Sequence, residues 1–442
     1  MSPLSNPFSG ALTTKVHRIL RLMLNRALGL VLQFGSVWLM ARWAGPEAVG
    51  GYSFFLAWML VLSAVSGMGT PLHALRAVSI LSHQKKVAAL RRYLWTASRG
   101  VLSLGSGMCL ILWVVQPNWM GVDALLWELI GLAAISALPF MLLRLFSEVL
   151  KGLDLPDHAM FWESLFLPAI FCLWMYAGHL QGSVLDALTL AKSYIVITLC
   201  SVLAMAWTFS AMVSKRDVPG TDGKGASPPS LAASVSDAEQ PPRWPLWLNH
   251  LVGMLFQNMP LLILPYVADS KGMGEFAVAY RYINVTTSLL MVVASVYGPQ
   301  FAREFADRSV QGLRQALKIT QQMSLLLLGP LLLAYVLLPE ILMALFGQDF
   351  ASGANLLRWM ALGQIIYAST GLVGYMMNMI HRDRFELAIL ISATAVMALM
   401  IGLLGTRYGV QGIAGGYALG LSLKSLTSFF AANHYLKLIK PH

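Results

Sequence analysis

The sequence predicts an all-helical integral membrane protein made of two related halves, each with six transmembrane helices. Of its 442 residues, 57% are hydrophobic and only 12% are charged, whereas about a quarter of a typical soluble domain is charged. Apolar runs of about 20 residues, the length that spans a bilayer, recur along the whole chain. An internal repeat predicts the division into halves.

The repeat relates residues 24–52 to residues 248–276, at an offset of 224 positions without a gap. Six positions are identical, and they are Leu24/Leu248, Asn25/Asn249, Gly29/Gly253, Gln33/Gln257, Ala44/Ala268 and Gly50/Gly274. The shared Asn, Gly and Gln are four residues apart, so they lie on one face of a helix. We infer that each half begins with an apolar helix that carries a stripe of polar and small side chains.

Twelve apolar runs are predicted to span the membrane. They are 18–42, 49–69, 93–115, 124–150, 159–177, 187–212, 246–268, 276–300, 319–339, 355–379, 386–405 and 411–436. Between the two sets of six, the segment 214–245 is rich in Pro, Gly, Ser and Asp and has no apolar periodicity, which is typical of a flexible linker. The predicted domains are therefore residues 1–213, a cytoplasmic linker at 214–245, and residues 246–442.

The distribution of basic residues predicts the orientation. With the N-terminus in the cytoplasm, 22 Lys and Arg residues fall on the cytoplasmic side, and only Arg42, Lys271 and Arg407 fall on the other side. Such an excess marks the cytoplasmic face, so both termini are expected in the cytoplasm. Because six spans per half is an even number, the halves have the same orientation and form a parallel repeat. Cytoplasmic loops also account for the net charge of +11 without a nucleic-acid partner.

No enzyme chemistry, metal or cofactor is expected. The three cysteines, Cys109, Cys172 and Cys200, all lie inside apolar runs, which argues against a disulfide framework and against a metal site. The sequence has no nucleotide-binding loop and no group of His and carboxylate residues within one extramembrane segment.

Five segments resemble polysaccharide flippases of the multidrug/oligosaccharidyl-lipid/polysaccharide exporter superfamily, in the order in which that family has them. They are ARWAGPEAVGGYSFF (41–55), SGMGTPLHALRAVS (66–79), EFAVAYRYI (275–283), LPEILMALFGQDFASGANLLRWMALG (338–363) and RYGVQGIAGGYALG (407–420). Each motif alone has little specificity. The resemblance depends on the order of the motifs, which covers nearly the whole chain.

The resemblance implies a MATE-like fold, in which two six-helix bundles face each other across a central cavity that opens alternately to either side. It implies a function in flipping undecaprenyl-pyrophosphate-linked oligosaccharide across the bacterial inner membrane for polysaccharide biosynthesis. The implied partners are this lipid-linked substrate, membrane lipids, and polysaccharide polymerase and chain-length components.

A diphosphate inside a membrane protein needs cations, and arginine suits it because it is permanently charged and bonds two oxygens at once. By the resemblance, Arg26 in span 1, Arg76 after span 2 and Arg281 in span 8 are the candidate ligands. Span 8 is predicted to begin at the outer side of the membrane, and Arg281 lies a short way into it, so Arg281 is not a cytoplasmic anchor. The alternative for Arg281 is an ion pair with Glu275 or Asp269.

Four polar side chains, Asn25, Gln33, Gln257 and Asn284, complete the candidate substrate site. A sugar headgroup needs such groups, because its hydroxyls would otherwise lose water without replacement. The stripe on span 1 has an equally good alternative, since polar and small residues also hold membrane helices together.

Other charged residues have less specific interpretations. Arg144 and Glu148 are four residues apart, so we expect them to neutralise each other; a gate is the alternative. Glu163 is expected to pair with a nearby base. Lys192 and Lys424 lie inside the sixth span of each half and could meet a sugar acid or a coupling proton, with no partner evident.

Arg358, near Asp349 and Glu340, is expected to be structural.

Two other functions of the protein remain open. A cation-coupled multidrug exporter shares the fold, but it needs a carboxylate in the first helix of a half, and spans 1 and 7 contain none. A non-transporting scaffold of a glycan-assembly complex is the other. The sequence specifies neither the sugar nor the source of energy.

Overall fold

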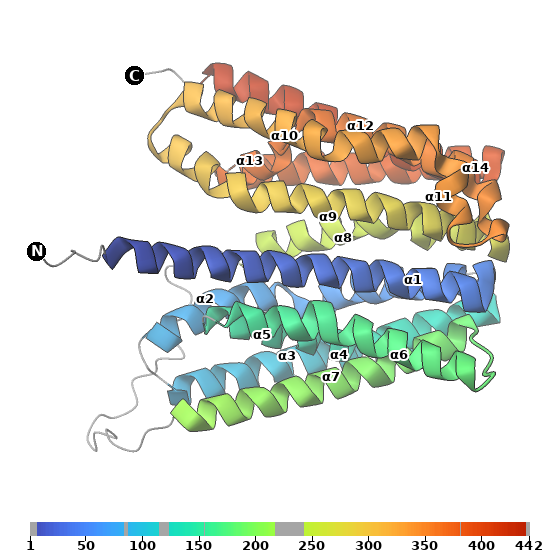
Figure 1. Ribbon diagram of the computed structural model, residues 1–442, viewed down its shortest axis with the longest axis horizontal. Helices are drawn as coiled ribbons and strands as arrows, with labels where there is room; N and C mark the ends of the chain where they lie inside the picture. The colour runs from blue at the N-terminus through green and yellow to red at the C-terminus, as the bar shows by residue number, and fades with distance from the viewer. Residues whose placement is uncertain are drawn as a thin grey trace, which may run out of the picture. The chain divides into compact units, whose positions relative to one another are not determined.

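The protein, seen here as a computed structural model, is described over residues 7–83, 87–114, 123–153, 155–216, 243–380 and 382–438, and these residues are almost entirely helical (Figure 1). The helices up to residue 216 are α1 (Pro7–Gly67), α2 (Thr70–His83), α3 (Val87–Val114), α4 (Ala124–Gly152), α5 (Pro156–Met160), the π-helical turn η2 (Phe161–Phe166), α6 (Leu167–Leu180) and α7 (Ala187–Arg216). The later helices are α8 (Arg243–Ile263), η3 (Leu264–Tyr266), α9 (Ser270–Ala306), α10 (Val310–Leu337), α11 (Pro339–Ala344), η4 (Gln348–Gly353), α12 (Ala354–Thr370), α13 (Val373–Met379) and α14 (Asp383–Leu438).

A helix lies at each of the twelve predicted spans, and the all-helical membrane class is confirmed. Two long helices contain two spans each, because they bend sharply at a glycine: α1 at Gly45 (φ 79°) and α14 at Gly409 (φ 60°). Both glycines have positive φ, a conformation that other residues rarely adopt, and both belong to motifs singled out in the sequence. Within the described residues, seven helices are long and apolar enough to cross a membrane.

Two helix breaks were not predicted. Span 2 ends at Gly67, and the chain turns through Met68 (φ 40°) and Gly69 (φ 73°) before α2 begins. Arg76 therefore lies on a second helix, α2, rather than at the end of span 2. Span 10 is also broken, because Gly371 (φ 68°) separates α12 from α13.

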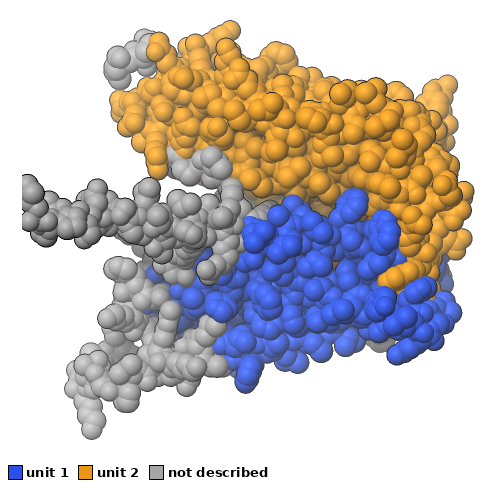
Figure 2. Space-filling view, viewed as in Figure 1, with its two compact units in different colours: residues 1–39, 62–184, 189–247 blue, residues 40–61, 185–188, 248–442 orange. Residues whose placement is uncertain are grey.

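The chain divides into two compact units, which Figure 2 colours separately. Unit 1 consists of residues 1–39, 62–184 and 189–247, and unit 2 of residues 40–61, 185–188 and 248–442. The end of span 1 and the first part of span 2, residues 40–61, thus belong to the same unit as the C-terminal half. The predicted domain boundaries remain a prediction, and most of the expected linker lies outside the described residues.

Unit 1 packs around α4, which contacts α2, α3 and α5. Its buried side chains are apolar or small, such as Leu129, Ala133 and Ala137. A second close contact joins α1 to η2, where a Cβ on Gly29 would lie 2.9 Å from the Cβ of Ser164. Gly29 therefore serves helix packing, which is the alternative that the sequence left open for the span 1 stripe.

Unit 2 packs around α12, which contacts α9, α10 and α14. The two halves of α14 approach closely through small residues, as the GVQGIAGGYALG motif predicts. Three glycines spaced four apart face the preceding half of the helix: Gly412 faces Leu404, Gly416 faces Ile401 and Gly420 faces Met397. Their missing side chains allow the backbones to meet.

Candidate functional site

Arg281 lies on α9 between two buried tyrosines that fix the orientation of the helix. The hydroxyl of Tyr280 donates to the backbone oxygen of Gln257, and the hydroxyl of Tyr282 donates to the backbone oxygen of Leu342 at 2.6 Å. The Tyr280 ring packs edge-on against Tyr417, with 5.5 Å between ring centroids. With a tyrosine anchored on either side, Arg281 occupies the remaining face of this turn.

The Arg281 guanidinium has no hydrogen bond and no ion pair within the described part of the chain, and its residue is half-buried. The expected alternative, an ion pair with Glu275 or Asp269, is wrong. Glu275 accepts a 2.6 Å hydrogen bond from Ser352 and lies 3.9 Å from Lys271. Asp269 instead caps α9 by accepting from the backbone N–H of Gly272 at 2.9 Å, a favoured role for aspartate before a helix.

Two other predicted site residues of unit 2, Asn284 and Gln257, lie on α9 or against it near the turn that carries Arg281. Asn284 is three residues further along α9, hence on the same face, and is half-buried. The Tyr280 contact places Gln257 of α8 next to this turn of α9, with its side chain exposed. Tyr52, from the part of α1 that follows the bend at Gly45, is buried and close enough to Arg281 to interact with it electrostatically. Unit 2 therefore combines a cation with two amides and a tyrosine.

The remaining predicted ligands belong to unit 1. Asn25 and Gln33 are half-buried on α1, and the backbone oxygen of Gln33 accepts a 2.8 Å hydrogen bond from Ser36. Arg26 and Arg76 lie on α1 and α2, and their side chains lie outside the described part of the structure. All four of these residues therefore remain predicted ligands.

The expected pairing of Arg144 with Glu148 inside α4 is wrong, because both side chains have other partners. Arg144 pairs across to η2, where its Nε lies 3.8 Å from Glu163 Oε1. Glu148 pairs with Lys151, at 2.7 Å from Nζ to Oε1. Glu163 also accepts a 2.7 Å hydrogen bond from Ser147, and its ion pair with Arg144 confirms that it pairs with a nearby base. The π-helical turn carries this carboxylate, and such turns are frequent at functional sites.

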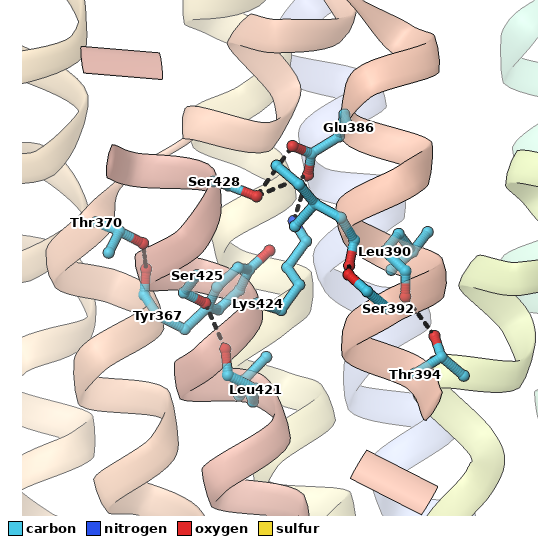
Figure 3. Close-up of polar contacts among 11 residues, drawn as sticks. Tyr367, Thr370, Glu386, Leu390, Ser392, Thr394, Leu421, Lys424, Ser425 and Ser428 are labelled. Atoms are coloured by element: carbon cyan, nitrogen blue, oxygen red, sulfur yellow. Dashed lines mark hydrogen bonds and ion pairs between the residues drawn. The ribbon is translucent and has the colours of Figure 1, made fainter. Parts of the chain in front are cut away.

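A buried ion pair of unit 2, between Glu386 and Lys424 of α14, was not predicted (Figure 3). Lys424 Nζ lies 2.7 Å from Glu386 Oε1, and their side chains are 15% and 5% exposed. Ser428, one turn after Lys424, donates to the same carboxylate at 2.9 Å. Lys424 was a candidate residue in the sequence, but no partner was predicted for it. Glu386 was not a candidate, because it lies close to Asp383 and Arg384 in a segment that the sequence indicates is a polar helix end.

Two other ion pairs lie at exposed positions. Lys192 of α7 meets Glu128 of α4 at 3.2 Å, and both side chains are about half exposed. Arg358 binds Glu340 at 2.7 Å, Asn355 at 2.9 Å and the backbone oxygen of Val336 at 3.2 Å. These contacts join α10, α11 and α12, which fits the structural role expected for Arg358.

No protein-family model matches the sequence, and no curated protein matches it. Solved structures do match. An inward-facing multidrug-resistance transporter of the MATE family, in the MOP superfamily, has a TM-score of 0.71 at 13% identity, covering 93% of this chain and 95% of that one. The lipid II flippase MurJ has a TM-score of 0.69 at 13% identity, covering 95% and 87% of the two chains.

A third similar structure is a MOP superfamily transporter from Pyrococcus furiosus, with a TM-score of 0.63 at 16% identity over 96% of both chains. At such low sequence identity, the structural similarity shows the fold but does not identify a substrate. The chain therefore has the all-helical membrane-transporter fold of the MATE and MurJ structures.

Proposed function

We propose that the protein flips undecaprenyl-pyrophosphate-linked oligosaccharide across the bacterial inner membrane, with both termini in the cytoplasm. The two halves would open a cationic cavity to each side in turn. The observation that carries the proposal is the Arg281 guanidinium, which has no acidic partner among the described residues. The chain shares its fold with the lipid II flippase MurJ.

The physical argument concerns charge inside a membrane. A cation inside a spanning helix is unfavourable, by at least about 2.5 kcal/mol when it lies at the helix centre, so such residues are normally paired with protein groups or face water. Arg281 is half-buried and flanked by tyrosines rather than carboxylates. A diphosphate would supply the missing counter-charge and accept two hydrogen bonds in one plane. A cationic drug would instead be repelled.

Asn284, on the same face of α9, and Gln257, on α8 where it contacts Tyr280, would add amide groups, and a sugar headgroup needs such donors and acceptors. The buried carboxylate of unit 2, Glu386, is neutralised by Lys424, so it offers a drug no free negative charge. Arg26 and Arg76 of unit 1 are the other proposed diphosphate ligands, by the resemblance of the sequence to the flippase family. Polysaccharide polymerase and chain-length components would receive the flipped product.

The test measures the amount of lipid-linked oligosaccharide on the inner leaflet of the membrane. It uses cells in which the only copy of this protein carries Arg281→Ala, Arg26→Ala or Arg76→Ala. Inner-leaflet intermediates should rise about tenfold in Arg281→Ala, which corresponds to losing one charge-assisted contact of about 1.4 kcal/mol. Arg281→Lys should retain part of the activity, because lysine keeps the charge without the bidentate geometry. Arg407→Ala is the matched control, since Arg407 is an exposed arginine of the same unit.

Protein abundance in the membrane is measured for every variant. If Arg281→Ala clears the lipid-linked intermediate as fast as wild type at equal abundance, Arg281 does not bind the substrate and the flippase proposal fails. A drug-efflux assay of the same cells then tests whether the protein is a multidrug exporter. Loss of drug resistance without accumulation of lipid-linked intermediates would indicate the exporter function.

A further inference from the structure

The Glu386–Lys424 pair is unusual among the described residues because it buries a charge. Glu386 is 4% exposed, and it is the one charged residue among the buried polar side chains of the described chain. Lys424 comes from the next span of the same helix, 38 positions later, and its side chain is 15% exposed. Two other ion pairs inside spanning helices are more open, because Arg144 and Glu163 are 31% and 28% exposed, and Lys192 and Glu128 are 58% and 49% exposed.

The pocket that holds the lysine ammonium is bordered by the Glu386 carboxylate, which the Ser428 hydroxyl also contacts. Glu386 Oε1 lies 2.7 Å from Nζ, and Ser428 Oγ lies 2.9 Å and 3.2 Å from the two carboxylate oxygens. Gly374 of α13 closes the pocket, since a Cβ there would lie 2.7 Å from Nζ and collide with the carboxylate. A side chain larger than glycine at position 374 would therefore crowd the ion pair.

The position of the pocket is also informative. The broken span 10 passes it, because Gly371 separates α12 from α13 and α13 carries Gly374. Figure 3 shows Lys424 extending toward Glu386 and Ser428, with Thr370 and Tyr367 on the neighbouring helix. Membrane transporters place bound cations beside discontinuous helices, where carboxylate, hydroxyl and free backbone oxygens can gather.

We propose that Lys424 is a tethered cation, which occupies a monovalent-cation site at the Glu386 carboxylate, beside the Ser428 hydroxyl. Its ammonium supplies the single positive charge that a sodium or potassium ion would otherwise supply to the Glu386 carboxylate. The buried carboxylate is thereby neutralised without an ion from solution. Lys424 would be the residue that makes this transporter independent of alkali cations, whatever it carries.

Removing the lysine separates this proposal from a purely structural pair. Lys424→Met leaves a buried carboxylate without a counter-charge, which is strongly destabilising. If the pocket is a cation site, Na⁺ or K⁺ will enter it and restore stability by mass action. If the pair only holds two helices together, no ion will replace the tether.

The experiment measures thermal unfolding of the purified full-length protein in detergent, at one pH and one ionic strength, in NaCl, KCl or choline chloride. The wild type should unfold at the same temperature in all three salts. Lys424→Met should unfold at lower temperature in choline and recover by about 4 °C or more in NaCl or KCl. The double variant Glu386→Gln/Lys424→Met should be insensitive to the salt, because the carboxylate charge is gone.

Lys192→Met is the matched control, since it removes a lysine from an exposed ion pair and should show no response to alkali cations. Three results would overturn the proposal: a wild type already stabilised by Na⁺ or K⁺, a Lys424→Met variant as stable as wild type in choline, or a variant equally unstable in every salt. The third result includes the case in which Lys424→Met never folds although the double variant Glu386→Gln/Lys424→Met does. None of these results depends on the transported substrate, so they stand apart from the flippase test.

Discussion

Gly50 and Gly274, which the internal repeat aligns at an offset of 224 residues, lie against each other in unit 2. A Cβ on Gly50 would lie 2.8 Å from the backbone nitrogen of Gly274 and 2.6 Å from Met273 Cβ, and a Cβ on Gly274 would collide with the backbone oxygen of Pro46. Residues that are equivalent in two copies meet when they lie near the twofold axis relating those copies. The shared glycines are thus explained by a contact between the start of span 2 and the start of span 8.

Gly274→Ala should destabilise the protein by about 1–3 kcal/mol, because the added methyl group would overpack a backbone contact. The measurement is the thermal unfolding midpoint in detergent. Gly253→Ala is the control, since Gly253 is also a repeat glycine and a Cβ added to it would meet nothing within 4 Å. Equal midpoints for the two variants would show that the Gly50–Gly274 contact carries no constraint.

The glycine face of span 12 offers a stricter comparison, between two adjacent residues. Gly416→Ala should destabilise by about 1–3 kcal/mol, because its Cβ would lie 2.8 Å from the backbone nitrogen of Ile401. Gly415→Ala should be neutral or slightly stabilising, because its Cβ meets nothing within 4 Å and alanine favours helix. A larger loss of thermal stability in Gly415→Ala than in Gly416→Ala would contradict the packing of spans 11 and 12.

The charged network between α4 and η2 predicts which residues are coupled. A double-mutant cycle of Arg144→Met with Glu163→Gln should give a coupling of about 0.2–1 kcal/mol, small because both side chains are about a third exposed. The same cycle with Glu148→Gln should give less, because Glu148 pairs with Lys151 instead. Unfolding midpoints of the single and double variants measure both cycles. A larger coupling with Glu148 would restore the pairing expected from the sequence.

The features that the sequence predicts correctly are local ones. Helices can be recognised from apolar runs because their length and composition are properties of contiguous residues. The sharp bends at Gly45 and Gly409 follow motifs that contain a glycine at the required position. The glycine spacing of span 12 also predicts a close contact, since small residues four apart form one face.

The features that the sequence misses depend on contacts between distant segments. Glu386 and Lys424 meet only because two antiparallel spans pack side by side, and no periodicity within either span records their register. Glu163 reaches Arg144 because a π-helical turn carries it toward α4. The predicted ligand Arg281 is recognisable from its place in a span, but its lack of an acidic partner among the described residues is a property of the tertiary structure.

Arg358 and Arg281 should respond in opposite ways to removal of their charge. Arg358→Ala removes three contacts that join α10, α11 and α12, so it should lower the unfolding midpoint, by about 1–2 kcal/mol in stability. Transport per folded molecule should stay within about twofold of wild type. Arg281→Ala removes a cation with no acidic partner among the described residues, so it should leave the midpoint unchanged or raise it while transport falls. Measuring both quantities on both variants decides the matter: a transport defect in Arg358→Ala at normal stability would place that arginine in the substrate path instead.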